Sequence, residues 1–274
     1  MLKNIIVMIA LLFSTQLSYS MTSFEGAMEE GYYPGYYRNS KRFKKSYEQF
    51  HFEKTPYHET SLIPKKIHQI WIGGEVPEKF KALMQTWKEK HPDWEYRLWT
   101  DKDIGGFAFE EPEAFFRAEN LGAKSDIWRY EILYQEGGVY VDIDFECIKP
   151  LDILVHHHSF FAGIGGFDYI NNAVIGSKPL HPILKKLTKI IKATPTDHLR
   201  SPWYNTGPLL FTRTVYHYLK DYPDEGIIYP TRFFYPLPNT YRFAYWRGEL
   251  PRETIESFFI PETFGVHYWA ESWR

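Results

Sequence analysis

A strand, a helix and a second strand follow one another between residues 66 and 99. The segment 66–72 is rich in β-branched residues and runs into Gly73-Gly74, which is typical of a strand closed by a turn. Residues 94–99 alternate in the manner of another strand. Between them, residues 77–90 carry large side chains at spacings of three and four, which share one helical face: Phe80, Leu83, Met84 and Trp87. Such β-α-β units build parallel sheets, so the sequence predicts an α/β fold.

The remainder of the chain extends this pattern. We expect further helices at 112–120, 125–136 and 182–192, and further strands at 139–141, 173–175 and 209–212. Of the 274 residues, 44% are apolar and 24% are charged, which excludes a disordered chain. The formal net charge of -2 gives no general basic surface for nucleic acid. The prediction is therefore one α/β domain with a three-layer core over residues 63–274.

The first 20 residues have the features of an export signal. Lys3 precedes an apolar stretch from Ile5 to Phe13, and small residues occur near the end of the segment. The stretch is shorter than the roughly 20 apolar residues that span a bilayer. We expect a cleaved signal peptide at 1–20 and a protein exported to a periplasmic, secreted or luminal location. The alternative is a retained anchor, and only in that case is a membrane partner expected.

Residues 21–62 differ in composition from the rest of the chain. A Tyr-rich stretch at 31–37 leads into a basic run at 38–45, and neither has a convincing apolar period. We interpret residues 21–62 as an extension that wraps the domain or stays partly mobile. A flexible linker is the alternative that the sequence leaves open.

Two aspartates follow the predicted strand 139–141. Because side chains alternate along a strand, Asp142 and Asp144 are expected to project to the same side. In open α/β sheets, ligands bind at the carboxyl ends of the strands. Two carboxylates at such an end suit Mg²⁺ or Mn²⁺, and either ion would screen a diphosphate. A solvated aspartate pair in a turn is the alternative interpretation of this motif by itself.

Asp126 and Arg129 lie in the helix that precedes this strand. Their spacing of three residues puts them on one helical face. A structural interpretation is also open, in which Asp126 is an acid in the first helical turn and Arg129 its surface partner. Together with the metal motif, however, an acid for hydroxyl groups and a cation for phosphate are what a sugar-nucleotide pocket needs.

Three motifs in this order resemble those of the DXD sugar transferases, glycosyltransferase family 32. They are Ile67-His-Gln-Ile-Trp71-Ile-Gly-Gly74, Ala123-Lys-Ser-Asp126-Ile-Trp-Arg129 and Gly137-Gly-Val-Tyr-Val-Asp142-Ile-Asp144. Asn205-Thr-Gly-Pro208 and the tail His267-Tyr-Trp269-Ala-Glu-Ser272-Trp273 extend the resemblance from about residue 63 to the last residues. The family includes fungal mannosyltransferases and sphingolipid sugar transferases, and it is related to the catalytic domains of clostridial glucosylating toxins.

The resemblance implies a GT-A fold and retaining, metal-dependent transfer from a nucleotide sugar. The donor would be a UDP- or GDP-sugar, and the acceptor a carbohydrate, a lipid or a protein. Trp71 would stack on the nucleotide base, while Asp126 and Arg129 would hold the donor sugar and its phosphate.

The resemblance also implies a metal site for Mn²⁺ or Mg²⁺. Asp144 and His267 would be ligands of the ion, and Asp142 would bind ribose and sugar while acting at the metal directly or through water. The remaining roles that the resemblance implies are the diphosphate side for Ser272 and Trp273 and the acceptor side for Asn205 and Gly207. Glu271 departs from the family pattern, because a small residue usually precedes the serine.

Two other classes of function compete with a sugar transferase. Haloacid-dehalogenase phosphohydrolases also have Asp-x-Asp after an apolar strand, but their motif normally continues with Thr or Val where this chain has Glu146. A non-catalytic sugar-binding module is the other candidate. The presence of all four of Arg129, Asp142, Asp144 and His267 argues against it.

Several further residues have ordinary structural interpretations. The aromatic content is 19%, and we expect most rings in the core, with Trp71, Trp269 and Trp273 as candidate walls of the donor site. Adjacent histidines rarely converge on one ion, so residues 156–158 are expected to form a surface loop. Asp101 is expected to cap the segment that follows it. Cys147, the single cysteine, is expected to be a small buried packing residue.

Overall fold

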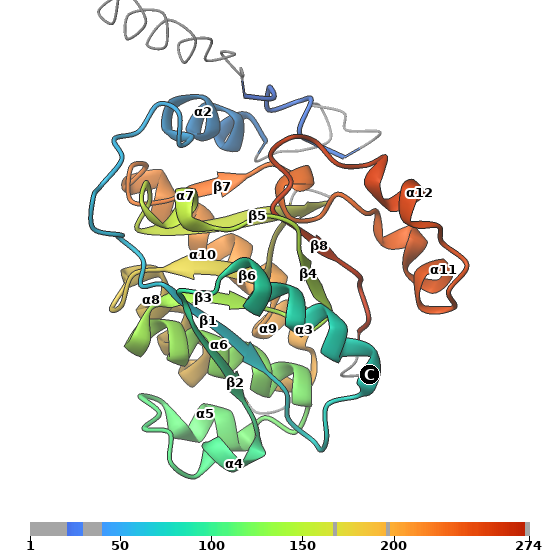
Figure 1. The fold of residues 1–274 in the computed structure, drawn as a ribbon. Coiled ribbons are helices and arrows are strands. Elements are labelled where there is room, and N and C mark those ends of the chain that lie inside the picture. Colours follow the sequence, from blue (N-terminus) through green and yellow to red (C-terminus); the bar gives the residue numbers. More distant parts are fainter. Residues whose placement is uncertain (1–20, 30–39, 167–168, 196–197, 272–274) are drawn as a thin grey trace, which may run out of the picture.

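The computed structural model describes residues 21–29, 40–166, 169–195 and 198–271. The predicted export signal at 1–20 lies outside these ranges. Figure 1 shows a twisted central sheet with helices around it. Within the described ranges, no helix is both long enough and apolar enough to span a membrane.

The central sheet has six strands in the order β2-β1-β3-β6-β5-β7. They are β1 (Lys66–Ile70), β2 (Glu95–Trp99), β3 (Gly138–Val141), β5 (Phe160–Gly166), β6 (Tyr169–Ser177) and β7 (Ile227–Tyr229). β1 is parallel to both β2 and β3, and β5 is parallel to β7. β6 is antiparallel to β3 and to β5. The predicted α/β class and the β-α-β unit are confirmed.

Helices pack on both faces of this sheet. The longer described helices are α2 (Ser40–Phe50), α3 (Glu78–Lys90), α6 (Leu121–Glu136), α8 (Pro182–Ala193) and α10 (Pro208–Asp221). The shorter ones are α4 (Asp101–Ile104), α5 (Pro112–Arg117), α7 (Asp152–Val155), α9 (Pro202–Asn205), α11 (Arg242–Trp246) and α12 (Arg252–Glu256). The helix α3 connects β1 to β2. The helix α6 connects β2 to β3, which lies on the other side of β1. Since parallel crossovers are right-handed, α3 and α6 lie on opposite faces.

The chain changes direction at the boundary between β1 and β3. From β1 it moves outward to β2, and its next strand in this sheet, β3, lies on the other side of β1. The loops after β1 and β3 therefore diverge and leave a crevice at their carboxyl ends, where α/β proteins bind ligands. Gly138 permits the close approach of the two strands. Its φ is +99°, and a Cβ there would lie 2.8 Å from the Lys66 carbonyl oxygen.

A small second sheet joins the segment after β3 to the C-terminal tail. β4 (Phe145–Cys147) pairs antiparallel with β8 (Gly265–His267), with Phe145 opposite His267. This pairing carries a residue from the end of the chain to the turn that contains Asp142 and Asp144. Cys147 is buried in β4, as predicted.

The N-terminal extension is part of the folded domain. Its described residues include α2, whose Phe43 and Tyr47 are buried, and the segment 21–29, whose Phe24 and Met28 belong to the main core. The described residues of the extension therefore contribute side chains to the main core. The interpretation of residues 21–62 as a separate extension of the domain stays a prediction. The Tyr-rich stretch 31–37 lies outside the described residues.

Two further local predictions were wrong. Residues 209–212 are not a strand but the beginning of α10, which starts with Pro208 at its first position. His156 and His158 are not on the surface, because both are buried. His156 lies against the extension, where its Nδ1 bonds the His58 carbonyl oxygen at 2.7 Å.

Candidate active site

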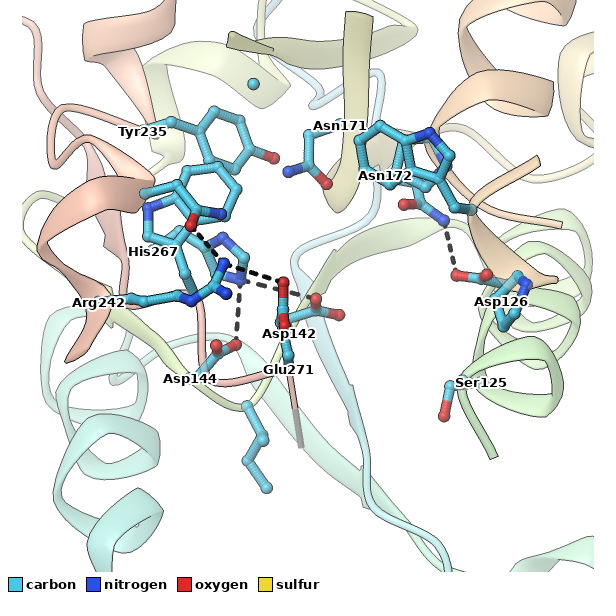
Figure 2. A pocket seen from close by; sticks show the side chains of 18 of the residues that line it. Ser125, Asp126, Asp142, Asp144, Asn171, Asn172, Tyr235, Arg242, His267 and Glu271 are labelled. Carbon is cyan, nitrogen blue, oxygen red and sulfur yellow. Dashed lines mark hydrogen bonds and ion pairs between the residues drawn. The ribbon is translucent and has the colours of Figure 1, made fainter. Parts of the chain in front are cut away.

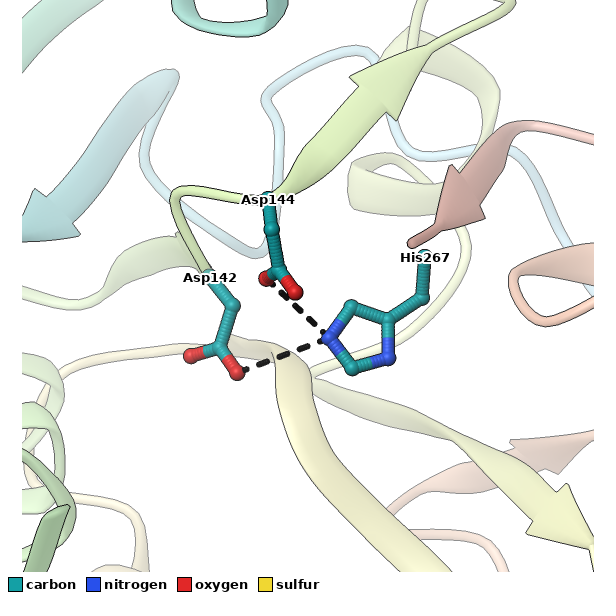
Figure 3. A group of neighbouring side chains, drawn as sticks. All are labelled: Asp142, Asp144 and His267. Carbon is teal, nitrogen blue, oxygen red and sulfur yellow. Dashed lines mark hydrogen bonds and ion pairs between the residues drawn. The ribbon is translucent and has the colours of Figure 1, made fainter. Parts of the chain in front are cut away.

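Asp142, Asp144 and His267 converge at the carboxyl end of β3. The two aspartates occupy the turn between β3 and β4, and the histidine ends β8. Its Nε2 lies 3.1 Å from Asp144 Oδ1 and 3.8 Å from Asp142 Oδ2 (Figure 3). Each residue offers one ligand atom, and these three atoms lie within 4.8 Å of one another. The three residues that the resemblance assigns to a metal are thus neighbours in space.

The chemistry of this cluster fits a divalent cation. Two carboxylate oxygens and an imidazole nitrogen are suitable ligands for Mn²⁺, and the carboxylates are suitable for Mg²⁺. Burial raises the pKa of Asp142; the Arg129 charge opposes this shift and the neighbouring Asp144 charge adds to it. Burial also acts to raise the pKa of Asp144, but attraction and hydrogen bonding from His267 outweigh it and leave that pKa lowered. Ionisation of both adjacent carboxylates therefore depends on nearby positive charge.

Arg129 is the fixed positive charge beside this cluster. Its side chain is 7% exposed and lies 3.1 Å from Asp142 and 3.3 Å from Asp126, measured from guanidinium nitrogen to carboxylate oxygen. It also donates to the Asn172 carbonyl at 2.8 Å, and its guanidinium lies 4.3 Å from the centre of the Tyr140 ring. Packing on a ring and bonding to three oxygens hold the cation in one orientation. With the imidazole neutral, as a metal ligand must be, the carboxylates of Asp126, Asp142 and Asp144 face one guanidinium charge, which leaves room for another cation.

Asp126 links α6 to the loop before α10. Asn172 Nδ2 donates to one of its oxygens at 2.7 Å, and Thr206 Oγ1 donates to the other at 2.8 Å. Burial raises the pKa of Asp126 to about 6, against the opposing effect of Arg129. The first-turn interpretation of Asp126 is wrong, because α6 begins four residues earlier than predicted, at Leu121, and is capped by Asn120.

The cluster opens into a cavity of about 1300 Å³ (Figure 2). Pockets for small ligands typically have about 300–1,000 Å³, so this one has room for a large ligand or two. Trp71, Asp126, Arg129, Asp142, Asp144, His267 and Trp269 all line it. Three buried polar atoms of the lining have no hydrogen-bond partner among the described residues: Trp71 Nε1, Tyr235 Oη and His267 Nδ1. Unpaired buried groups cost free energy that a ligand can recover.

Trp71 follows β1 directly and lies on the opposite side of the crevice from β6. Its ring packs against Phe80 of α3, with centroids 5.5 Å apart. The next turn is held by Asp101, whose Oδ2 accepts hydrogen bonds from the N–H groups of Gly73 at 2.9 Å and Gly74 at 3.3 Å. Thr100, not Asp101, forms the cap of α4. Asp101 therefore shapes the loop beside Trp71.

The expected acceptor residues Asn205 and Gly207 are not among the residues that line the cavity. The Asn205 side chain, at the end of α9, donates to the His198 carbonyl at 2.9 Å, shortly before it in the chain. Gly207 lets the backbone approach the site, because a Cβ there would lie 3.0 Å from Asp126 Oδ2. Their neighbours Trp203 and Pro208 do line the cavity.

The C-terminal tail closes one side of the cavity. The Ala270 N–H donates to Asp144 Oδ2 at 2.6 Å, and Trp269 Nε1 donates to the Leu237 carbonyl at 2.8 Å. Glu271 has a φ of +46°, in the left-handed region that favours glycine, which accounts for the small residue usual in the family. Its carboxylate lies 3.2 Å from Arg242. Ser272 and Trp273 lie outside the described residues.

Some residues of the site were missed from the sequence. Asn172 holds Asp126 through its side-chain amide. Tyr140 holds Asp142, because its hydroxyl donates to that carboxylate at 2.7 Å. Tyr140 lies in β3, two positions before Asp142 in the turn that follows, so alternation along the chain could have indicated it. Arg242 begins the short helix α11 and Tyr235 lies in a loop, and neither has such a local pattern.

Comparison with known proteins supports the same family. Residues 77–161 match the family described as "Glycosyltransferase sugar-binding region containing DXD motif". The resemblance to the DXD sugar transferases is confirmed. Inositol phosphoceramide mannosyltransferase 3 of Schizosaccharomyces pombe is 31% identical over 225 residues, which cover 77% of this chain and 61% of that protein. Mannosyl phosphorylinositol ceramide synthase SUR1 of Saccharomyces cerevisiae is 35% identical over 163 residues, covering 55% and 41%.

The chain thus spans about two fifths to three fifths of the length of these relatives. Among solved structures, the PaToxG glycosyltransferase has a TM-score of 0.51 and 22% identity, covering 66% of this chain and 76% of its own. At that identity the likeness concerns the fold, which is the GT-A fold that the resemblance implied.

Proposed function

We propose that this protein is a metal-dependent retaining glycosyltransferase that moves a sugar from a UDP- or GDP-sugar to an acceptor hydroxyl. The observation that carries the proposal is the convergence of Asp142, Asp144 and His267 beside Arg129 in one cavity. This constellation combines sites for a cation and for an anion at the switch point of an α/β sheet. A nucleotide sugar presents a diphosphate, which needs both.

Different residues of the site would bind different parts of the donor. Asp144 and His267 would hold Mn²⁺ or Mg²⁺, with Asp142 beside them, and the ion would neutralise charge that develops on the diphosphate as the sugar leaves. Arg129 is fixed by its neighbours and stabilises the same charge without reorganising. Asp126, bonded to Asn172 and Thr206, would accept bonds from sugar hydroxyls.

The nucleoside would lie toward β1. Trp71 lines the cavity there, and an indole is a suitable stacking surface for a base. Ser272 and Trp273, which follow Glu271 in the sequence, would act near the diphosphate.

Relatives and family suggest candidate substrates. The fungal relatives are named for mannosyl transfer to inositol-bearing ceramides, so a mannosyl donor and a glycan or glycolipid acceptor are the first candidates, with a protein acceptor next. The proposed setting is the exported compartment predicted from residues 1–20.

A donor screen tests the proposal. The full chain is incubated with UDP-glucose, UDP-galactose, UDP-N-acetylglucosamine and GDP-mannose, with Mn²⁺ or with a chelator, and nucleoside diphosphate release is measured. We expect turnover of at least one donor only with metal. Hydrolysis of p-nitrophenyl phosphate without turnover of any donor would support the phosphohydrolase alternative. No turnover and no nucleotide binding would support a non-catalytic binding module.

Retention of configuration has its own test. The proton NMR spectrum of the first product formed from an α-linked donor should show an α-anomer. A β-anomer as the first product would overturn the retaining mechanism and leave sugar transfer intact.

A further inference from the structure

The cavity has a second end that the donor roles do not use. In the sheet order, β1 and β6 flank β3, so Trp71 after β1 and Tyr169 at the start of β6 lie on opposite sides of Asp142. The cavity lining beyond Asp142 includes Gly165, Tyr169 and Asn171 from the β5–β6 hairpin, and Trp203 from α9. A donor whose base lies at Trp71 and whose diphosphate lies at Asp144 leaves this end open.

The N-terminal segment 21–29 forms part of this end and is held in place at several points. Glu262 accepts hydrogen bonds from the N–H and the hydroxyl of Thr22 at 2.9 and 2.7 Å. The Tyr47 hydroxyl donates to the Thr22 carbonyl at 2.8 Å, and the Arg232 N–H donates to the Ala27 carbonyl at 2.8 Å. Burial of Phe24, Ala27 and Met28 fixes the segment further. Its last residue, Glu29, is therefore positioned by the fold.

Glu29 is a lining residue of the cavity. A Cβ added to Gly166 would lie 3.2 Å from one of its carboxylate oxygens, so this glycine leaves space for the acid at the hairpin. Tyr169 is close by: its hydroxyl pKa is raised first by burial and also by the charge of Glu29. An acid from the N-terminal segment thus lies beside the β5–β6 hairpin.

An exposed aromatic surface accompanies this acid. Trp203 is 39% exposed although it lines the cavity, and its ring meets that of Tyr169 at 5.0 Å and 70°. Tyr235 adds a buried hydroxyl with no hydrogen-bond partner in the described part of the chain, and Figure 2 shows that hydroxyl facing the side-chain amide of Asn171.

We propose that Glu29 and Trp203 form the acceptor subsite, and that it binds a neutral ring rich in hydroxyl groups, either a sugar or a cyclic polyol. The proposal rests on the function proposed above. An indole covers the C–H face of such a ring, while a carboxylate accepts from two neighbouring hydroxyls. Tyr235 and Asn171 supply the neutral donors and acceptors that fix its orientation. An anionic group at this end is disfavoured, because it would meet the charge of Glu29.

The test measures binding without requiring turnover. Saturation-transfer NMR is recorded on the full chain with Mg²⁺ and either UDP or GDP, using methyl α-D-mannopyranoside and myo-inositol as probes. We expect transfer to at least one probe and weaker transfer to mannose 6-phosphate. Glu29→Gln and Trp203→Ala should each weaken binding about tenfold, the scale of one charge-assisted hydrogen bond or one stacked ring. Glu29→Gln should also reduce the preference over mannose 6-phosphate.

A matched control lies in the same segment. Glu25 pairs with Lys44 at 2.6 Å on the surface, and Glu25→Gln should leave probe binding unchanged. Thermal melting of every variant verifies folding, and Trp203→Phe should retain part of the binding. Wild-type protein that binds none of the probes, or folded Glu29 and Trp203 variants that bind them equally well, would overturn the subsite. Probe binding without turnover of any donor would overturn the proposed transferase and leave the subsite standing.

Discussion

The donor side and the rim of the cavity are built in different ways. Trp71, Asp142 and Asp144 come directly after neighbouring parallel strands, so the sheet positions them through short connections. The rim joins segments that are far apart in the chain, as in the Thr22–Glu262 contact across 240 residues and the Asp144–His267 contact across 123. The proposed catalytic groups therefore stand at the edge of the sheet, while the groups around them depend on closure of both ends of the chain.

This difference separates two kinds of variant. A change on the donor side should remove chemistry and leave the fold in place. A change in the N-terminal segment should weaken the fold and, through it, the acceptor end. The following predictions begin with the largest expected effect.

Asp144→Ala should abolish metal-dependent donor turnover, with a loss of about 10³-fold or more, since the preorganised charge at the leaving group disappears. Nucleoside diphosphate release with Mn²⁺ measures it. Asp152→Ala is the control, because Asp152 pairs with Lys65 outside the cavity. Unchanged turnover in Asp144→Ala would contradict the assignment of this residue to the metal.

Phe24→Ala should lower the free energy of unfolding by about 3–5 kcal/mol, the usual result of removing a buried phenyl ring. Phe24 is 1% exposed in the main core, although α2 separates it from the first of the three sequence motifs. Urea unfolding measures the change. A loss below about 0.5 kcal/mol would mean that residues 21–29 are not part of the cooperative fold.

The core beneath the donor side should be sensitive to acid. His68 is buried, its Nδ1 accepts from Trp99 Nε1 at 3.2 Å, and burial lowers its pKa to about 4. Its ordinary value of about 6.5 applies in the unfolded chain, so the stability it contributes is complete above pH 6.5 and is lost as the pH falls toward 4. Full protonation of His68 should therefore lower the free energy of unfolding by an amount on the order of 3 kcal/mol. Urea unfolding at pH 7.5 and 4.5 should show a smaller pH dependence in His68→Gln, and equal dependence would refute this role.

Trp71→Ala should weaken nucleotide binding by about 1–3 kcal/mol through the loss of stacking. Calorimetry with UDP or GDP and Mn²⁺ measures the affinity. Trp94→Ala is a control within the same β-α-β unit, since Trp94 bonds Asp152 and does not line the cavity. Equal affinity in wild type and Trp71→Ala would remove Trp71 from the base site.

The contrast between short connections and contacts of distant segments also decides which features the sequence predicts. The strand-helix-strand unit and the aspartate pair depend on periodicity and short spacing, so local patterns indicate them. The helix at residues 40–50 was missed because basic residues surround its buried Phe43 and Tyr47. The strand expected at 209–212 was wrong because an apolar run has no intrinsic element type, and Pro208 began a helix. His156 was placed on the surface because its cover comes from His58, almost a hundred residues away.

Binding of Mn²⁺ tests the central claim most directly. Electron paramagnetic resonance of free Mn²⁺ is followed as the full chain is added in the presence of UDP or GDP, with Asp144→Ala alongside. We expect the wild type to remove the free Mn²⁺ signal with a stoichiometry of one ion per chain, and the signal to remain when the variant is added. A free signal that the wild type leaves unchanged, or that both proteins reduce equally, would contradict a metal site at Asp142, Asp144 and His267.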